Sequence, residues 1–172
     1  MSVAAVSSAA QPLERPQPSE SESRLSQEAS MLVSDILNHK GRDVVTVSPG
    51  DTLESIVNLL ARRRIGAVVV TEGQDVVGIL SERDIVRCLA AYGVGALSRK
   101  AEDAMTREVM TCGEDDRIEE IMARMTEGRF RHMPVRKDGR LLGLVSIGDV
   151  VKARLEEYER DAQALREYIA TA

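Results

Sequence analysis

Aromatic residues are scarce in this chain, which has three Tyr, one Phe and no Trp. Surfaces that bind nucleic acid by base stacking need aromatic rings, so the scarcity argues against that class of protein. The formal net charge of -5 argues equally against general binding to phosphate backbones or anionic membranes. We therefore expect an aliphatic core, and neither nucleic acid nor membrane as a partner.

Cysteine and long apolar runs are also rare. Cys88 and Cys112 are the only cysteines, neither lies in a C-x-x-C motif, and aliphatic neighbours favour roles as small apolar fillers. Two thiols without a secretory signal favour a reducing compartment, and we predict a cytoplasmic protein. No apolar run approaches the roughly 20 residues of a membrane span. Residues 1–28, rich in Ser, Pro, Gln and Glu, are predicted to form a disordered tail.

Patterns of catalytic and metal-binding residues are missing as well. His39 and His132 are the only imidazoles, and their spacing matches no metal-ligand motif. The chain contains neither a G-x-x-x-x-G-K-[ST] phosphate loop nor a G-x-G-x-x-G turn. We predict that the protein is not an enzyme, has no catalytic residues and requires no metal.

What the chain does have is an internal repeat. A shift of 65 residues aligns residues 44–86 with 109–151 without a gap, and 11 of these 43 positions are identical. The copies end in the matching stretches GILSERDIV (78–86) and GLVSIGDVV (143–151). Such a duplication points to two similar units that bury a core by packing together.

Each copy has the pattern β-α-β-β-α. The β-rich segments DVVTVSP and EVMTCGE come first, followed by helices with apolar residues three and four positions apart. Asp51 and Asp116 are predicted N-caps of these helices, each followed three residues later by Glu. The turns TEGQD and RKDGR then join two strands into a hairpin, and another helix follows Ser81 or Ser146.

Further helices flank the two copies. Short helices over 30–39 and 98–106 lead into the repeats, the second with Ser98 as its predicted N-cap. The last segment is a long helix with an apolar edge, which packs against the same chain or a partner subunit more often than against membrane: Leu155, Tyr158, Leu165 and Ile169. We divide the chain into a tail (1–28), two repeats with their leading helices (29–95 and 96–155) and a C-terminal helical extension (156–172).

In each copy the last strand ends with Gly, two apolar residues and Ser, and an Asp follows three residues after the Ser. This tandem unit resembles the CBS domain (named after cystathionine β-synthase). Two copies resemble a stand-alone CBS pair, or Bateman module, over about residues 30–160, and RHMPV before the second hairpin fits the resemblance. It implies an α/β (α+β) fold whose repeats pack about a pseudo-twofold axis and leave two clefts. It also implies a regulatory sensor that acts on an unknown protein effector. The sensor is expected to form a homodimer, with an interface that the long C-terminal helix extends.

The resemblance implies an adenosine-containing ligand, AMP first, with ATP, ADP, NAD(H) and S-adenosyl compounds as alternatives. In the family pattern the turn Ser and the following Asp hold the ribose, here Ser81 with Asp84 and Ser146 with Asp149. A carboxylate can accept both hydroxyls of a diol, and a helix N-terminus favours its ionised form and offers N–H groups to phosphate. The alternative interpretation is that both pairs are only helix caps.

The other candidate ligand-binding residues are divided between the two clefts by the resemblance. The second-repeat cleft has Ser146 and Asp149, the phosphate ligands Arg131 and His132, and an opposite wall of Lys40, Asp43, Val44 and Val45. The first-repeat cleft has Ser81 and Asp84, room at Gly66 and Ala67, a wall of Thr106, Val109 and Met110, and Arg83 as a further cation. A structural interaction module with degenerate clefts and an NAD(H) redox sensor remain alternatives.

Overall fold

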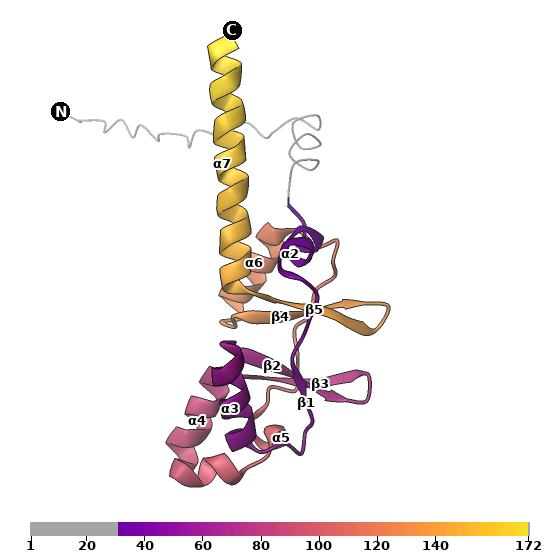
Figure 1. Ribbon diagram of the computed structural model, residues 1–172, viewed down its shortest axis with the longest axis vertical. Helices are drawn as coiled ribbons and strands as arrows, with labels where there is room; N and C mark the ends of the chain where they lie inside the picture. The colour runs from indigo at the N-terminus through magenta and orange to yellow at the C-terminus, as the bar shows by residue number, and fades with distance from the viewer. Residues whose placement is uncertain (1–30, 172) are drawn as a thin grey trace, which may run out of the picture. The chain divides into compact units, whose positions relative to one another are not determined.

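The computed structural model describes residues 31–171, so the predicted tail lies outside the described residues. The first repeat consists of β1 (Thr46–Val47), α3 (Leu53–Arg63), β2 (Ala67–Glu72), β3 (Asp75–Ser81) and α4 (Glu82–Tyr92). The second consists of α6 (Ile118–Glu127), β4 (His132–Lys137), β5 (Arg140–Ser146) and α7 (Ile147–Thr171). The leading helices are α2 (Val33–Lys40) and α5 (Ala101–Ala104), and the 3-10 helix η1 (Gly93–Ser98) precedes α5 (Figure 1).

The two hairpins confirm the predicted repeat. Strand β2 pairs antiparallel with β3, and β4 with β5, and both ladders shift register at the same place, after Val70 and after Val135. Gly73 and Gly139 lie in the connecting turns with φ of +63° and +79°, which glycine adopts without Cβ strain.

The predicted first strand forms in only one copy. Strand β1 runs parallel to β2, with Thr46 beside Val69, and gives a sheet of order β1-β2-β3. The matching segment of the second repeat makes a single bridge, Cys112 to Val135, beside the two-stranded sheet β4-β5. The first segment has three valines and the second has one, and β-branched side chains favour extended strands.

The helix starts differ from the predicted caps by one residue. The N-cap of α3 is Thr52, whose Oγ1 accepts a hydrogen bond from the Ser55 N–H at 3.3 Å. Asp51 and Asp116 instead accept hydrogen bonds from the backbone N–H three residues earlier, at 2.8 and 3.1 Å, and so close the turn before each helix. Ser98, also a predicted N-cap, is the last residue of η1.

Each leading helix packs into the core of the other repeat. Helix α2 contributes Val33, Ile36 and Leu37 to the core formed with β4, β5, α6 and α7. The α5 segment contributes Ala101 and Met105 to the core formed with β1 to β3, α3 and α4. Figure 1 shows α2 beside β5 and α6, and α5 beside β1 and β3. The two repeats therefore interlock, because neither core is complete without the segment that precedes the other repeat.

The glycine of the repeated Gly-Ser-Asp stretch permits this interlocking. A Cβ added to Gly143 would lie 2.7 Å from Leu37 Cδ2, and one added to Gly78 would collide with Met105. A Cβ never approaches a neighbour this closely without displacing it. The leading segments thus reach the return strands only because these positions have no side chain.

Both cysteines are buried in the aliphatic cores and form no disulfide. Burial, together with the nearby Asp116 carboxylate, raises the pKa of the Cys112 thiol to about 12, although Arg124 opposes the shift. A thiol with this pKa is almost entirely protonated near neutral pH and is a poor nucleophile.

Helix α7 is only partly used by the described domain. It buries Val150, Ala153 and Glu157, whereas every residue from 158 to 171 is exposed. Leu155 is exposed as well, so the whole predicted apolar edge is exposed. Neither α7 nor another helix between residues 31 and 171 is long and apolar enough to cross a membrane.

Candidate ligand-binding site

A Ser–Asp corner lies at each junction between a hairpin and its following helix. In the first, Asp84 Oδ2 accepts hydrogen bonds from the backbone N–H of Ser81 at 2.9 Å and from its Oγ at 2.6 Å. In the second, Asp149 Oδ2 accepts the same two bonds from Ser146 at 2.8 and 2.7 Å. Both corners are capping interactions at a helix N-terminus. Helix capping alone therefore does not distinguish the two corners.

A cavity of about 530 Å³ borders the first corner only. Small-molecule sites occupy roughly 300–1,000 Å³, so the cavity has the size of a ligand site. The cavity is lined from β3 and the start of α4, from the segment after α5, and from the segment that leads into β4: Ile79, Ser81, Arg83, Asp84, Arg87, Thr106, Glu108, Val109, Met110, Gly128, Arg129, Phe130, Arg131 and His132. The structure thus brings together the predicted residues Ser81, Arg83, Asp84, Thr106, Val109 and Met110.

Arg131 and His132 adjoin both corners, not the second corner alone. Both line the cavity that contains Ser81 and Asp84, whereas the sequence placed them with the second corner. His132 also pairs with Ser146 across the β4–β5 ladder, and the Arg131 carbonyl accepts a hydrogen bond from the Ile147 N–H at 2.9 Å, so the backbone of both residues adjoins the second corner as well. This arrangement joins residues from both repeats in one cavity.

Gly66 and Ala67 play a different part from the one predicted. Ala67 pairs with Ser81 across the β2–β3 ladder and is buried, and the carbonyl of Gly66 accepts a hydrogen bond from the Glu82 N–H at 3.0 Å. Neither residue lines the cavity. Both residues therefore support the first corner through backbone contacts and do not form a wall of the cavity.

The cavity contains an excess of cationic side chains. Four arginines (Arg83, Arg87, Arg129 and Arg131) line it against two carboxylates, Asp84 and Glu108. Arg83 Nη1 donates to the carbonyl of Arg129 at 2.6 Å, and Arg87 Nη1 lies 3.8 Å from Asp84 Oδ1. No carboxylate of residues 31–171 lies within ion-pair distance of Arg129 or Arg131. These two guanidinium groups can therefore meet an anionic ligand.

Several lining residues were missed by the sequence analysis. Two of them carried a usable signal: Arg87 follows Arg83 by four residues on α4, so both occupy one helix face. Arg129 is identical to Arg64 in the aligned copy, and both adopt a left-handed backbone with φ of 54° and 53°. Ile79, Glu108, Gly128 and Phe130 carried no such signal. Within residues 31–171, no three His, Cys, Asp or Glu side chains are grouped as metal ligands.

His132 marks the boundary between the two corners. Its Cε1 lies 3.2 Å from the place that a Cβ on Gly66 would occupy, so the absent side chain leaves space for the ring. Burial, then the positive charges of Arg131 and Lys40, lower the pKa of the imidazole below its ordinary value. The ring is therefore neutral at pH 7.

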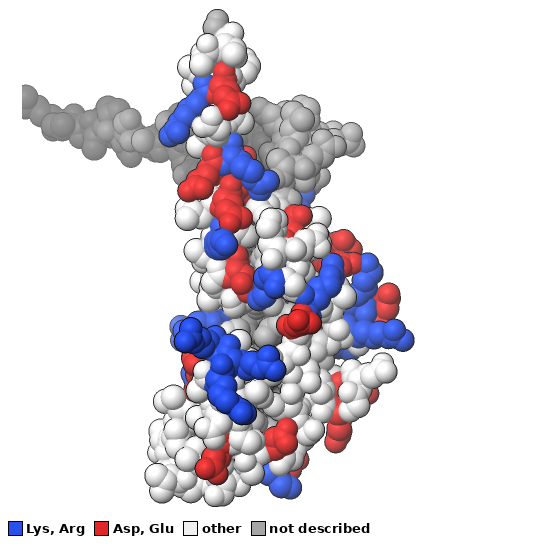
Figure 2. All heavy atoms as spheres, in the orientation of Figure 1, with Lys and Arg blue, Asp and Glu red and all other residues white. Residues whose placement is uncertain are grey.

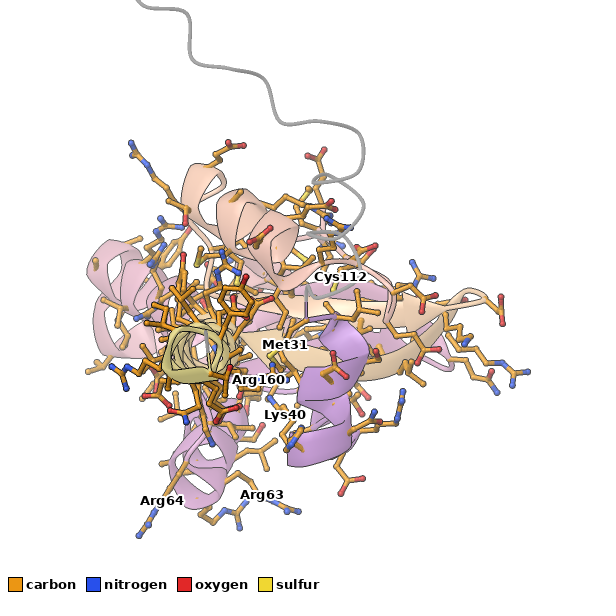
Figure 3. All side chains as sticks on the ribbon, turned by 90° about the horizontal axis from the view of Figure 1, so that it is seen from above. Met31, Lys40, Arg63, Arg64, Cys112 and Arg160 are labelled. Carbon is orange, nitrogen blue, oxygen red and sulfur yellow. The ribbon has the colours of Figure 1, made fainter. Side chains whose placement is uncertain are left out.

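Lys40 occupies the second corner. Its Nζ lies 2.6 Å from Asp149 Oδ2 and donates to the carbonyl of Leu144 at 3.0 Å. Figure 3 shows Lys40 between α2 and α7. Burial acts to raise the pKa of Asp149, but the hydrogen bonds from Lys40 and Ser146 outweigh it and lower the pKa. The structure thus brings Lys40 and Asp149 together, as an ion pair within the chain.

The remaining predicted wall of the second cleft is open to solvent or used by the fold. Asp43 is exposed, Val44 and Val45 are half-buried, and the carbonyl of Val45 accepts a hydrogen bond from Val69 in the sheet. Beside Lys40 and Asp149 lies a smaller hollow of about 160 Å³, between α2 and α7. Basic side chains gather at the C-terminal end of α3, where Arg63 and Arg64 lie on the same side as Lys40 (Figures 2 and 3).

Comparison with known proteins agrees with the repeated architecture. The sequence profile of the CBS domain matches residues 33–91 and 101–156. The chain is 35% identical over 149 residues to the CBS domain-containing protein CBSX3, mitochondrial, of Arabidopsis thaliana, a match that covers 81% of this chain and 72% of that protein. It spans between 22% and 76% of the length of other curated relatives.

Solved structures show the same fold. The CBS-domain containing protein ATU1752 from Agrobacterium tumefaciens has a TM-score of 0.71 and 46% identity, covering 73% of this chain and 94% of that one. The CBS domain protein PAE2072 from Pyrobaculum aerophilum, complexed with AMP, has a TM-score of 0.62 and 28% identity, covering 69% and 89%.

Proposed function

The chain belongs to the CBS domain family, and on that premise we propose that it is a regulatory module that binds an adenine nucleotide in the cavity beside Ser81 and Asp84. One observation carries the proposal. The Ser–Asp corner shares a cavity with Arg129 and Arg131, whose guanidinium groups have no carboxylate partner among residues 31–171. A diol acceptor and phosphate-binding cations therefore lie on opposite walls of one site.

Each wall suits one part of a nucleotide. Asp84, which lines the cavity, uses Oδ2 for its capping bonds, and the nearest cation to its Oδ1 among residues 31–171 is Arg87 Nη1 at 3.8 Å, so Oδ1 can accept hydroxyl hydrogens of the ribose. Val109 and Met110 offer apolar contact to the faces of the adenine ring. Arg129 and Arg131 then receive the phosphate, and a guanidinium can bind two of its oxygens at once.

AMP is the ligand we propose first. The related protein from Pyrobaculum aerophilum was crystallised with AMP, which supports this choice. A further hollow of about 400 Å³ shares Arg83, Arg129, Phe130 and Arg131 with the cavity. It leaves room for the additional phosphates of ADP and ATP or for the second nucleotide of NAD(H), so these remain alternatives.

The second corner is the weaker candidate for a ligand. A ribose at Asp149 has to displace the ammonium group of Lys40 from a 2.6 Å contact. We therefore propose one nucleotide per chain. The same ion pair supports a second candidate function, a structural interaction module, because the Asp149 carboxylate is already bound by Lys40 of the same chain. In either case we propose a non-catalytic cytoplasmic protein that acts on a protein effector still to be identified.

Isothermal titration calorimetry tests the proposal with AMP, ADP, ATP, NAD, NADH and S-adenosylmethionine. We expect one adenine compound to bind with one site per chain, and Asp84→Ala to abolish binding. The matched variant Asp149→Ala should bind like the wild type. At 100 times its dissociation constant, the ligand should raise the free energy of unfolding by about 2.7 kcal/mol.

Two results would overturn this assignment. If none of the six compounds binds, the nucleotide function is wrong and the structural interaction module is favoured. If Asp149→Ala abolishes binding while Asp84→Ala does not, a nucleotide binds but at the other corner.

A further inference from the structure

The exposed part of α7 carries an apolar stripe with a regular spacing. Its residues recur at alternating intervals of four and three: Val151, Leu155, Tyr158, Ala162, Leu165 and Ile169. This is the spacing of the a and d positions of a heptad, with Leu155, Ala162 and Ile169 at a. About three heptads of such a pattern favour a coiled coil.

The described domain does not cover this stripe. Leu155 is 58% exposed, Leu165 60% and Ile169 66%. The α7 residues that pack on the domain, Val150 and Ala153, occupy the c and f positions on the opposite side of the helix. The stripe is therefore left for another helix.

The stripe also needs a partner on physical grounds. Residues 158–171 form 14 residues of exposed helix, a length that is marginal in water without tertiary packing. A cluster of large apolar side chains on one helix face is the usual sign of an interaction surface. A further helix against this face would bury the stripe and stabilise the extension.

The flanking charges identify the partner as a second copy. Asp161 lies at a g position and Arg166 at the following e position, and neither has an ion-pair partner among residues 31–171. In a parallel, in-register pair, the g position of one helix faces the following e position of the other helix. Asp161 therefore faces Arg166 of the second copy, and the twofold symmetry makes this pair occur twice. Figure 2 shows acidic and basic side chains interspersed along α7.

We propose that α7 pairs with α7 of a second copy of this chain in a parallel, in-register coiled coil. The interface uses none of the residues that line the cavity, so the inference does not depend on the proposed ligand. It defines the surface, direction and register of a homodimer.

Cysteine cross-linking of the full chain tests direction and register together. Leu155→Cys and Ile169→Cys, made separately, both replace exposed a-position residues, and the native cysteines are buried. In the proposed pair each position lies against its own copy, so mild oxidation should convert both variants to covalent dimers. Ala164→Cys, at the outward c position, should stay monomeric on the same non-reducing gel.

Other arrangements give other results. The two a positions lie roughly 21 Å apart along the helix axis, so an antiparallel pair can cross-link at only one of them. Cross-linking at one position only, at neither, or equally at Ala164→Cys would overturn the proposal. Absence of cross-linking at both positions is also the result expected if another segment or another protein covers the stripe.

Charge exchange tests the predicted pairing of Asp161 with Arg166 of the second copy. Asp161→Arg and Arg166→Asp should each weaken self-association several-fold in sedimentation equilibrium, because like charges then face each other. The double variant should restore it, and Arg160→Asp, at the outward f position, should change it little. Failure of the double variant to recover would overturn the proposed register.

Discussion

Lys40 Nζ lies 2.6 Å from Asp149 Oδ2, whereas Asp84, at the matching position of the first repeat, borders an open cavity. The difference comes from the leading segments. Leu37 and Met105 occupy equivalent places against the two motif glycines, and three residues further on come Lys40 in one copy and Glu108 in the other. The Lys40 ammonium group therefore forms an ion pair with Asp149, whereas the Glu108 carboxylate cannot form one with Asp84.

Removing Lys40 should open the second corner. In Lys40→Ala, Asp149 loses its ammonium partner, and we expect calorimetry to detect a second, weaker nucleotide site in addition to the first. Lys100→Ala, another exposed lysine in an ion pair, serves as the control and should keep one site per chain. An unchanged stoichiometry in Lys40→Ala would show that the ion pair is not what closes this corner.

The same variant should show a pH-dependent loss of stability. The pKa of Asp149 is lowered in the folded state, so its contribution is present above the ordinary value of 3.8 and is lost as the pH falls through the folded-state pKa. At pH 7 we expect Lys40→Ala to lower the free energy of unfolding by about 0.2–1 kcal/mol, the range for partly exposed ion pairs. Urea unfolding should show this difference shrink below pH 3.8; a constant difference would contradict it.

Arg129 should contribute to ligand affinity where its counterpart Arg64 does not. Hydrogen bonds to charged groups contribute about 1.5–3 kcal/mol, so Arg129→Gln should raise the dissociation constant by roughly ten- to a hundredfold. Arg64→Gln is the matched control, because Arg64 follows α3 in the same left-handed conformation but lies outside the cavity. Equal effects of the two variants in calorimetry would argue against the proposed phosphate position.

His132 should make the protein less stable as the pH falls. Its folded-state pKa lies below the ordinary value of 6.5, so its contribution is complete above about pH 6.5 and is lost as the pH falls toward the folded-state pKa. The free energy of unfolding, measured in urea from pH 8 to 5, should fall less steeply in His132→Gln than in the wild type. Equal slopes in the variant and the wild type would contradict this prediction.

Gly143 should not tolerate a side chain. Because a Cβ would meet Leu37 at 2.7 Å, Gly143→Ala should cost about 1–3 kcal/mol, as overpacked cores do. Thermal unfolding measures this cost directly. Gly50→Ala, where a Cβ meets nothing within 4 Å, should stay within about 0.5 kcal/mol of the wild type.

Much of the architecture was predictable from the sequence because it depends on local signals and on their repetition. The hairpins, the helices after Ser81 and Ser146 and the two Ser–Asp corners all follow from residues a few positions apart. The predicted first strand of the second repeat was wrong, because packing against neighbouring segments decides whether a segment forms a strand or a single bridge. The two predicted Asp caps were also wrong, because the same carboxylate can close the turn before a helix instead of capping it.

By itself, the sequence determined that this protein is a duplicated β-α-β-β-α chain with a Ser–Asp corner in each copy and an apolar edge on its last helix. Only the tertiary structure decided that Arg131 faces Asp84, that Lys40 holds Asp149 and that the edge of α7 is exposed. The physical reason is sequence separation. Lys40 and Asp149 meet across 109 residues because the leading helices cross between the repeats; the family resemblance placed them at one cleft, but only the packing of α2 shows that they form an ion pair.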